Sequence, residues 1–306
     1  MTIAFKIGTR GSPLALAQAH EVKHCLGLAH QIDADAIEIV VIKTSGDAIL
    51  DRSLSEAGGK GLFTKELDIA LMRGEVDMAV HSAKDLPTVL PAEIAIAGYL
   101  PREDVRDAWI SPCASHPLGL PPRGIVGTAS LRRGAMVKRL RPDVSIALLR
   151  GNVATRLAKL TAGEMDATLL ALAGLKRLGL EARATAVLDA REFVPAAGQG
   201  AIAVTVRSSD GAMRDVVAPM LDAATGSALA AERAFLHVLD GSCKTPIGAY
   251  ARIEQGSLLF HAMVLKPDGS RFFESVLSGP PDQAAALGQA AGRDLLARIP
   301  AHFFEA

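Results

Sequence analysis

The first 200 residues alternate short apolar segments with longer amphipathic ones, and few folds accommodate this alternation. IAFKIGT, AIEIVVIKT and VDMAVHS have the length and the apolar character of β-strands, and helix-like stretches separate them. The first of these helices is expected to follow Ser12, a good N-terminal cap, with Pro13 at its first position. Strands joined through helices favour parallel pairing, so the sequence predicts parallel sheets with helices on their faces.

The alternation resumes after residue 123. A loop rich in Pro and Asp is expected to follow the strand that ends near Ser82. Beyond it, strands are predicted at 124–130, 145–150 and 167–173, with helices at 131–141 and 152–163 between them. The chain therefore contains a second α/β segment.

Two pairs of similar sequence segments, here called the internal echoes, relate these α/β segments. LMRGEVDMAVHSAKDL at 71–86 resembles LTAGEMDATLLALAGL at 160–175, and GTRGS at 8–12 resembles GTAS at 127–130. In the first pair a helix end precedes a strand, and in the second pair a strand end leads into a capped helix start. Two similar α/β domains in tandem would explain both of them.

The remainder of the chain changes character. Residues 193–207 form a glycine-rich turn and a strand, which are expected to return to the first domain. After a helix at 226–239, three segments at 247–253, 258–265 and 271–277 are typical of antiparallel strands, and a helix at 282–299 follows. We expect three domains: 1–100 with 200–218, then 101–199, then a small α+β domain at 219–306.

The net charge is zero, with 33 basic and 33 acidic residues, but residues 123–191 contain 13 basic and 5 acidic side chains. Such a basic segment indicates an anionic ligand, either nucleic acid or a small polyanion. No run of about 18 apolar residues predicts a membrane span, and the N-terminus resembles a strand rather than a signal peptide. The three cysteines are far apart, so neither a disulfide framework nor a CxxC metal site is expected, and a reducing cytoplasm fits best.

Arginines gather where predicted strands give way to helices. Ligands bind at the carboxyl ends of parallel strands, and helix N-termini attract anions. Four groups occupy such positions: Arg10 with Ser12; Ser130 with Arg132 and Arg133; Arg150 with Asn152 and Arg156; and Arg177 after the strand at 167–173. Each arginine taken alone could be a solvated surface charge, but their shared position favours anion binding. No GxGxxG fingerprint or GxxxxGK[ST] loop is present, so a nucleotide is not the obvious anion.

Two further segments carry candidate chemistry. In HSAKDLPT, the strand runs into Ser82, Lys84 and Asp85, and this aspartate is either an acid–base group or a turn residue before Pro87. His81 is expected to be structural. In DGSCKTPIG, Cys243 lies on a loop beside Lys244, which could lower the pKa of the thiol. The residues themselves leave open whether this thiol is functional or incidental.

These motifs together resemble the porphobilinogen deaminase (hydroxymethylbilane synthase) family, whose members join four pyrroles during tetrapyrrole biosynthesis. The resemblance runs along nearly the whole chain. It rests, in the family's order, on TRGSPLALAQ, GGKGLFTKEL, AVHSAKDLP, GTASLRRG, LRGNVATRL, LAGLKRLG, PAAGQGAIAV and GSCKTPIG.

The resemblance implies both a fold and a reaction. The implied fold is α/β, with two lobes like the halves of periplasmic binding proteins and a small α+β C-terminal domain. Cys243 would hold a dipyrromethane cofactor through a thioether bond. Four porphobilinogen molecules would be added head to tail with loss of ammonia, and hydrolysis would release hydroxymethylbilane.

The family also implies roles for individual residues. Asp85 would be catalytic, stabilising cationic intermediates and relaying protons. The implied cofactor-binding residues are Cys243, Ser82, Lys84, Asp85, Ser130, Arg132, Arg133 and Arg156. The implied substrate-binding residues are Arg10, Ser12, Gln18, Lys60, Phe63, Arg150, Arg156 and Arg177. No metal is expected, and residues 47–59 would form a mobile loop near the site.

Three positions depart from the commonest family pattern: Ser242 replaces Gly, Ala83 replaces a larger apolar residue, and Glu56 lies where some members have Lys. The expected protein is a cytoplasmic monomer that binds no nucleic acid or membrane. The main alternative is a non-catalytic anion-binding protein of the same two-lobed fold, which would need the arginines but neither Asp85 nor a loop thiol. A nucleic-acid binder is a weaker alternative, because residues 123–191 contain no aromatic side chain for base stacking.

Overall fold

The structure is a computed structural model that describes residues 4–45, 61, 63–239, 245–300 and 303. These residues form two compact units. The first contains the described residues up to 103 together with 200–226, and the second contains 104–199 and the described residues from 227 onward. The division into three domains with the boundaries given above stays a prediction.

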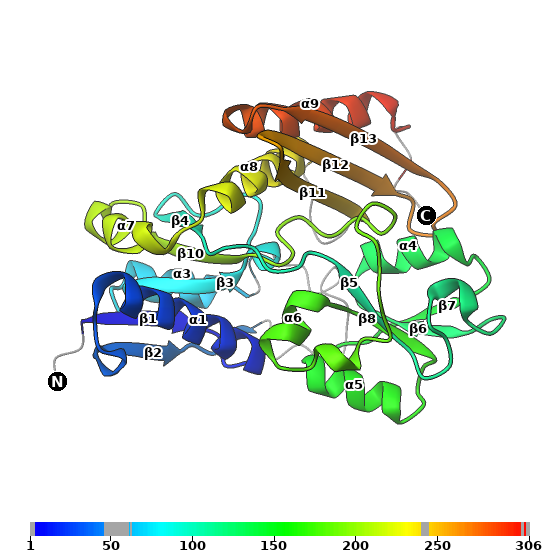
Figure 1. Cartoon of the computed structure of the whole chain (residues 1–306), viewed down its shortest axis with the longest axis horizontal. Coiled ribbons are helices and arrows are strands. Elements are labelled where there is room, and N and C mark those ends of the chain that lie inside the picture. The colour runs from blue at the N-terminus through cyan, green and yellow to red at the C-terminus, as the bar shows by residue number, and fades with distance from the viewer. Residues whose placement is uncertain (1–3, 46–60, 62, 240–244, 301–302, 304–306) are drawn as a thin grey trace. The chain divides into compact units, whose positions relative to one another are not determined.

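A five-stranded sheet with the order β2-β1-β3-β10-β4 forms the centre of the first unit (Figure 1). Its strands are β1 (Phe5–Thr9), β2 (Ile37–Val41), β3 (Met78–Ser82), β4 (Ile94–Tyr99) and β10 (Ile202–Arg207). The helices that the described residues of this unit form include α1 (Pro13–His30), α3 (Lys65–Met72) and α7 (Gly211–Val217). Strand β10 returns to the N-terminal sheet as expected.

The first sheet is mixed, so the prediction of a parallel sheet is only partly right. Strand β1 runs parallel to β2 and β3, but β10 pairs antiparallel with both β3 and β4. The physical reason is the connection. Strand β10 arrives from a distant part of the chain, and only successive strands joined by a crossover helix are constrained to run parallel.

The second unit contains a sheet of the same design, with the order β7-β6-β8-β5-β9. Its strands are β5 (Asp107–Ile110), β6 (Ile125–Gly127), β7 (Ser145–Ala147), β8 (Ala167–Ala171) and β9 (Ala186–Val187). The helices beside it are α4 (Leu131–Leu140), α5 (Val153–Thr161) and α6 (Leu172–Arg177). Here β7, β6 and β8 are parallel, and β5 is antiparallel to β8 and β9.

Two sequence predictions fail in these sheets. The Pro- and Asp-rich segment expected to be a loop contains β4 and β5, and Trp109 of β5 is fully buried. The strand predicted at 167–173 ends at Ala171, where α6 begins. Residues 172–175 of α6 are all buried, and an uninterrupted apolar run does not distinguish a buried helix from a buried strand.

The internal echo corresponds to a repeated structure. Asp77 precedes β3 and accepts the backbone N–H of Lys6 at 2.7 Å, while its own N–H donates to the carbonyl of Lys6. Asp166 precedes β8 and bonds to Ile125 in the same way: its carboxylate accepts the backbone N–H of Ile125 at 2.7 Å, and its own N–H donates to the carbonyl of Ile125. The two aspartates therefore fix equivalent strand pairs, and the prediction of two similar α/β lobes is confirmed.

The C-terminal segment forms the predicted α+β arrangement. It contains α8 (Ala223–Val238), β11 (Ile247–Glu254), β12 (Ser257–Leu265), β13 (Phe272–Gly279) and α9 (Ala284–Arg298). The three strands form an antiparallel sheet with β12 in the centre, and α9 packs on β12 and β13 (Figure 1). Among the described helices, none combines the length and the apolar character that crossing a bilayer requires.

Candidate anion-binding and catalytic site

Six of the predicted site residues line one pocket of about 60 Å³ in the first unit: Arg10, Ser12, Gln18, Phe63, Ser82 and Asp85. The fold explains their meeting, because β1 and β3 are parallel neighbours and their carboxyl ends lie side by side. Ser12 caps α1 as predicted, accepting the backbone N–H of Ala15 at 3.3 Å.

Arg10 connects the aromatic and acidic residues of this pocket. Its guanidinium lies over the ring of Phe63, 4.0 Å from the ring centroid, and 3.9 Å from Oδ2 of Asp85. The Asp85 side chain is 35% exposed, so a ligand can reach it. The arrangement offers a carboxylate, a positive charge and an aromatic surface within one small volume.

Gln18 fixes the end of β3. Its amide Nε2 donates to Oγ of Ser82 at 2.9 Å, and the same hydroxyl lies 3.1 Å from the amide oxygen. Gln18 is itself buried on the inner face of α1. The helix therefore holds the strand end from which Lys84 and Asp85 continue as a single 3₁₀ turn at Ala83–Asp85.

His81 is structural, as expected. It is buried, and its Nε2 lies 3.0 Å from Oγ1 of Thr205 on β10. Burial, helped by the charge of Arg10, lowers the pKa of His81 to about 4. The imidazole is therefore neutral at physiological pH, and it adds no positive charge to the pocket that it lines.

Asp68 was missed by the sequence reasoning. It lies on α3, one turn after the pocket residue Thr64, and is only 4% exposed. Burial raises its pKa to about 6, although a hydrogen bond with Thr64 opposes the shift. Within the described part of the chain, its Oδ1 has no hydrogen-bond partner. The available signal was an acidic residue between the apolar Leu67 and Leu71.

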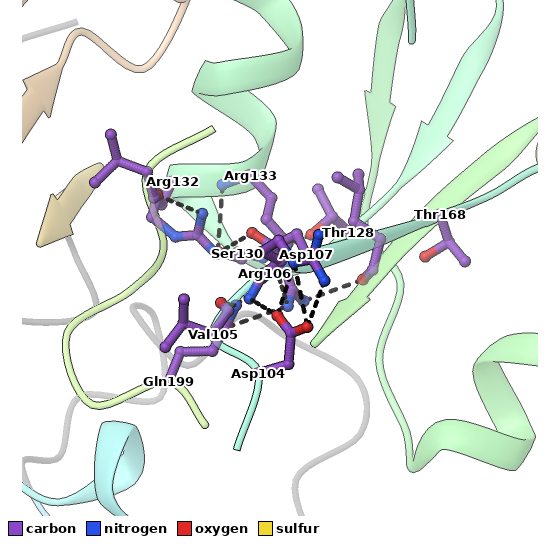
Figure 2. Close-up of polar contacts among 12 residues, drawn as sticks. Asp104, Val105, Arg106, Asp107, Thr128, Ser130, Arg132, Arg133, Thr168 and Gln199 are labelled. Carbon is purple, nitrogen blue, oxygen red and sulfur yellow. Dashed lines mark hydrogen bonds and ion pairs between the residues drawn. The ribbon is translucent and has the colours of Figure 1, made fainter. Parts of the chain in front are cut away.

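The second unit brings Arg132 and Arg133 together around one buried carboxylate (Figure 2). Ser130 caps α4 and accepts the N–H of Arg133 at 3.4 Å, which places both arginines in the first turn. Nη2 of Arg132 donates to Oδ2 of Asp107 at 2.7 Å, and Nη2 of Arg133 donates to Oδ1 at 2.7 Å. Both guanidinium groups are at least nine-tenths buried.

The same cluster is anchored to the surrounding backbone. Arg132 donates to the carbonyl of Val194 at 2.8 Å, and Arg133 to that of Leu169 at 3.0 Å. Gln199 donates from Nε2 to Oδ1 of Asp107 at 3.0 Å. Burial alone would raise the pKa of Asp107, but the two guanidinium groups outweigh burial and hold that pKa well below its usual range.

The arginine pair carries one more positive charge than the carboxylate it binds. Burial lowers the pKa of Arg132, and the charge of Asp107 opposes this shift only in part. Among the described residues, none accepts a hydrogen bond from the buried Nε of Arg132. An anionic ligand would supply both the missing acceptor and the missing charge.

The remaining predicted arginines lie elsewhere in the second unit. Arg150 and Arg156 are half-buried on either side of the start of α5, and Nε of Arg156 donates to the carbonyl of Gly151 at 2.8 Å. Asn152 caps α5 by accepting the N–H of Thr155 at 2.9 Å. Arg177 follows β8 as predicted, but it is the last residue of α6 and so lies at the end of a helix.

Two of the predicted residues, Lys60 and Cys243, lie outside the described residues, as do Glu56, Ser242 and the expected mobile loop at 47–59. Cys243 falls in the sequence between α8 and β11, as predicted. Ala83 is buried, and its N–H donates to the carbonyl of Ala201 at 3.0 Å.

The fold and these two sites define a class: an α/β protein with two helix-flanked mixed sheets, each presenting arginines near the carboxyl ends of its parallel strands. Comparison with known proteins identifies a family within this class. Residues 5–215 match the family model described as "Porphobilinogen deaminase, dipyromethane cofactor binding domain", and residues 227–297 match "Porphobilinogen deaminase, C-terminal domain". The chain belongs to the porphobilinogen deaminase family, as its motifs predict, and the first matched domain binds a dipyrromethane cofactor in that family.

Two curated relatives are similar over almost their entire length. The porphobilinogen deaminase of Nitrobacter hamburgensis is 55% identical over 298 residues, covering 97% of this chain and 94% of the relative. The porphobilinogen deaminase of Nitrobacter winogradskyi is 54% identical with the same coverage. Both relatives are named as porphobilinogen deaminases, so they give no support to the alternative of a non-catalytic anion-binding protein. A periplasmic substrate-binding protein from Coxiella burnetii shows a remote structural likeness, with a TM-score of 0.45 and 14% identity over 71% of this chain and 91% of that chain.

Proposed function

We propose that this protein is a porphobilinogen deaminase, a transferase that condenses four porphobilinogen molecules head to tail, releases ammonia and yields hydroxymethylbilane. The observation that carries the proposal is the pocket of the first unit, where the Asp85 carboxylate lies 3.9 Å from the Arg10 guanidinium at the end of β3. Family membership and the names of the relatives support it.

Asp85 is assigned the catalytic role because its carboxylate is negatively charged and a substrate can reach it. Loss of ammonia from porphobilinogen leaves a cation, and forming the bond between two pyrroles creates another. A carboxylate within reach stabilises these cations and carries a proton away from the new bond. Arg10 beside it would bind a carboxylate of the substrate and so bring the pyrrole toward Asp85.

The dipyrromethane is assigned to Cys243 and to the residues that match the family's cofactor motifs. Its carboxylates would be held by Ser82, Lys84, Ser130, Arg132, Arg133 and Arg156, with Asp85 beside its pyrrole N–H groups. The surplus positive charge and the Nε of Arg132, which has no acceptor among the described residues, support the assignment of the arginine pair. When bound, the cofactor supplies the pyrrole carbon to which the first substrate is joined.

The substrate and the growing chain are assigned to Arg10, Ser12, Gln18, Lys60, Phe63, Arg150, Arg156 and Arg177. Each pyrrole unit carries an acetate and a propionate, so a site for several units needs several guanidinium groups. Phe63 offers a flat surface for a pyrrole ring, and Arg10 already stacks on it. We further propose that the protein acts as a monomer in the cytoplasm, without nucleic acid or membrane partners.

The test is the substitution Asp85→Ala in the full-length protein. Because an acid–base group contributes typically 10²–10⁴-fold, ammonia release from porphobilinogen should fall at least about 100-fold. The exposed Asp35→Asn serves as a control and should retain the wild-type rate. Thermal unfolding should show that both variants remain folded. Wild-type turnover in Asp85→Ala would contradict the assignment.

A further inference from the structure

Glu232 is a fully buried carboxylate whose two oxygens join three segments of the second unit. It lies in the middle of α8, and its exposed fraction is 0%. Oε2 accepts the backbone N–H of Gly198 at 2.6 Å, and Oε1 accepts the backbone N–H of Ala251 on β11 at 2.8 Å. A buried carboxylate is unfavourable unless such bonds compensate its desolvation, so this group fixes a particular arrangement of the three segments.

The segment held through Gly198 is the glycine-rich turn at 195–200. Gly198 and Gly200 both have positive φ, at 75° and 89°, so the backbone direction on either side of Gln199 is one that other residues rarely adopt. The turn is also tied to β11, because Ala249 donates its N–H to the carbonyl of Pro195 at 2.8 Å. Gln199 between the two glycines is completely buried.

Gln199 in turn orients the carboxylate at the centre of the arginine cluster. Its Nε2 donates to Oδ1 of Asp107 at 3.0 Å and to the carbonyl of Val105 at 2.8 Å. Asp107 then holds Arg132 and Arg133 through bonds of 2.7 Å (Figure 2). From Glu232 to the arginines, each step is therefore a peptide bond or a hydrogen bond between buried groups.

We propose that Glu232 is a positioning residue for the arginine pair. By fixing the glycine-rich turn, it sets the direction of Gln199, which sets the rotamer of Asp107 and hence the direction in which the two guanidinium groups present their remaining N–H groups. This inference rests on the proposed function for the identity of the anion, a dipyrromethane carboxylate. Glu232 itself touches neither the cofactor nor the substrate in this account.

Glu232→Gln tests the inference with little change in shape. The amide keeps one acceptor oxygen but turns an N–H₂ group toward one of the two backbone donors. Full-length apoprotein from cells unable to make porphobilinogen is mixed with porphobilinogen, and the gain in intact mass of two pyrrole units is followed over time. We expect uptake at least about tenfold slower than in the wild type, and a rise in KM larger than the fall in kcat.

The matched control is Asp222→Ala. Asp222 lies just before the same helix, and its carboxylate accepts the backbone N–H of Thr225 at 2.7 Å, a bond within the first turn of α8 and not with the glycine-rich turn. This variant should lose helix-cap stability and yet take up the pyrrole units within about twofold of the wild-type rate. If both variants slow uptake in proportion to their loss of thermal stability, Glu232 is merely structural and the inference fails.

Gln199→Leu tests the connection from the glycine-rich turn to Asp107 without changing Glu232. It therefore tests the inference even if Glu232→Gln does not fold. It should slow uptake at least about tenfold, and the double variant should be no slower than the slower single variant, because both act through one path. Normal uptake in Gln199→Leu, or losses that multiply in the double variant, would overturn the inference alone. Failure of the wild-type protein to take up pyrrole units or to release ammonia would instead overturn the proposed function and this inference with it.

Discussion

Two buried aspartates, Asp68 and Asp107, have opposite electrostatic properties in this protein. Asp107 faces two guanidinium groups and a glutamine amide, so its pKa lies well below the usual range. Asp68 lies in an apolar helix face, where burial raises its pKa to about 6 although a hydrogen bond with Thr64 favours its ionised form. The difference comes from the partners, since both side chains are almost completely inaccessible.

The substitution Asp68→Asn should stabilise the protein at alkaline pH. The pKa of Asp68 is raised from 3.8 in the unfolded chain to about 6, so the folded state favours the protonated form and the residue's contribution is lost as the pH rises from 3.8 through 6. Removing the charge should raise the free energy of unfolding at pH 8 by up to about 3 kcal/mol.

Urea denaturation at pH 8 and pH 4.5 measures this effect, and the gain should largely disappear at the lower pH. The exposed Asp35→Asn is the control and should change the free energy of unfolding by less than about 0.5 kcal/mol at either pH. An equal gain at both pH values would show that ionisation of Asp68 is not the cause.

At the scale of elements, α8 and α9 approach one another closely enough that two positions of α9 accept only glycine. A Cβ atom on Gly288 would lie 2.0 Å from the carbonyl oxygen of Ala231, and one on Gly292 would lie 2.7 Å from Cβ of Val238. Helix α8 carries Glu232, so this contact also holds the helix that anchors the glycine-rich turn.

Gly288→Ala should therefore lower the free energy of unfolding by about 3 kcal/mol, because the backbone of α8 must move away. Gly226→Ala on α8 is the matched control, since among the described residues no atom outside the adjoining helix backbone lies within 4 Å of the added Cβ. Alanine is the better helix former, so this control should raise the free energy of unfolding by about 0.5–1 kcal/mol. Denaturant titrations measure both values, and equal effects of the two substitutions would contradict the described packing.

Local sequence patterns predicted most elements but not those that depend on distant pairing. The cap at Ser12 and the echo between the segments of Asp77 and Asp166 are local, and both appear in the structure as expected. Strands β4 and β5 were missed because each is short and lies among Pro and Asp residues. Their stability comes from pairing with β10 and β8, which are distant in the sequence, and local patterns cannot show this.

Those residues of the candidate site that directly follow the ends of strands could be predicted from the sequence. Arg10 and Asp85 could be placed together because the carboxyl ends of neighbouring parallel strands meet. Asp107, Gln199 and Glu232 could not, because each lies in an apolar or glycine-rich segment and its partners come from other elements. A polar residue in an apolar run was the only local signal for them.

At the scale of the whole molecule, a neutral chain concentrates positive charge in one segment. Residues 123–191 contain 13 basic and 5 acidic residues, yet two of these arginines are buried around Asp107, which lies outside that segment. Pairing them with a carboxylate from β5 orients the guanidinium groups while leaving one positive charge for a ligand. Such a distribution suits a linear product that gains two carboxylates with each added pyrrole.

The intact mass of the purified protein, with peptide mapping of its three cysteines, tests the central claim most directly. The account predicts extra mass equal to two linked pyrrole units, located on the peptide that contains Cys243 and absent from a Cys243→Ser variant. Protein isolated without this mass should gain it after porphobilinogen is added. An unmodified chain after that addition, or pyrrole units attached at Cys25 or Cys113, would contradict the account.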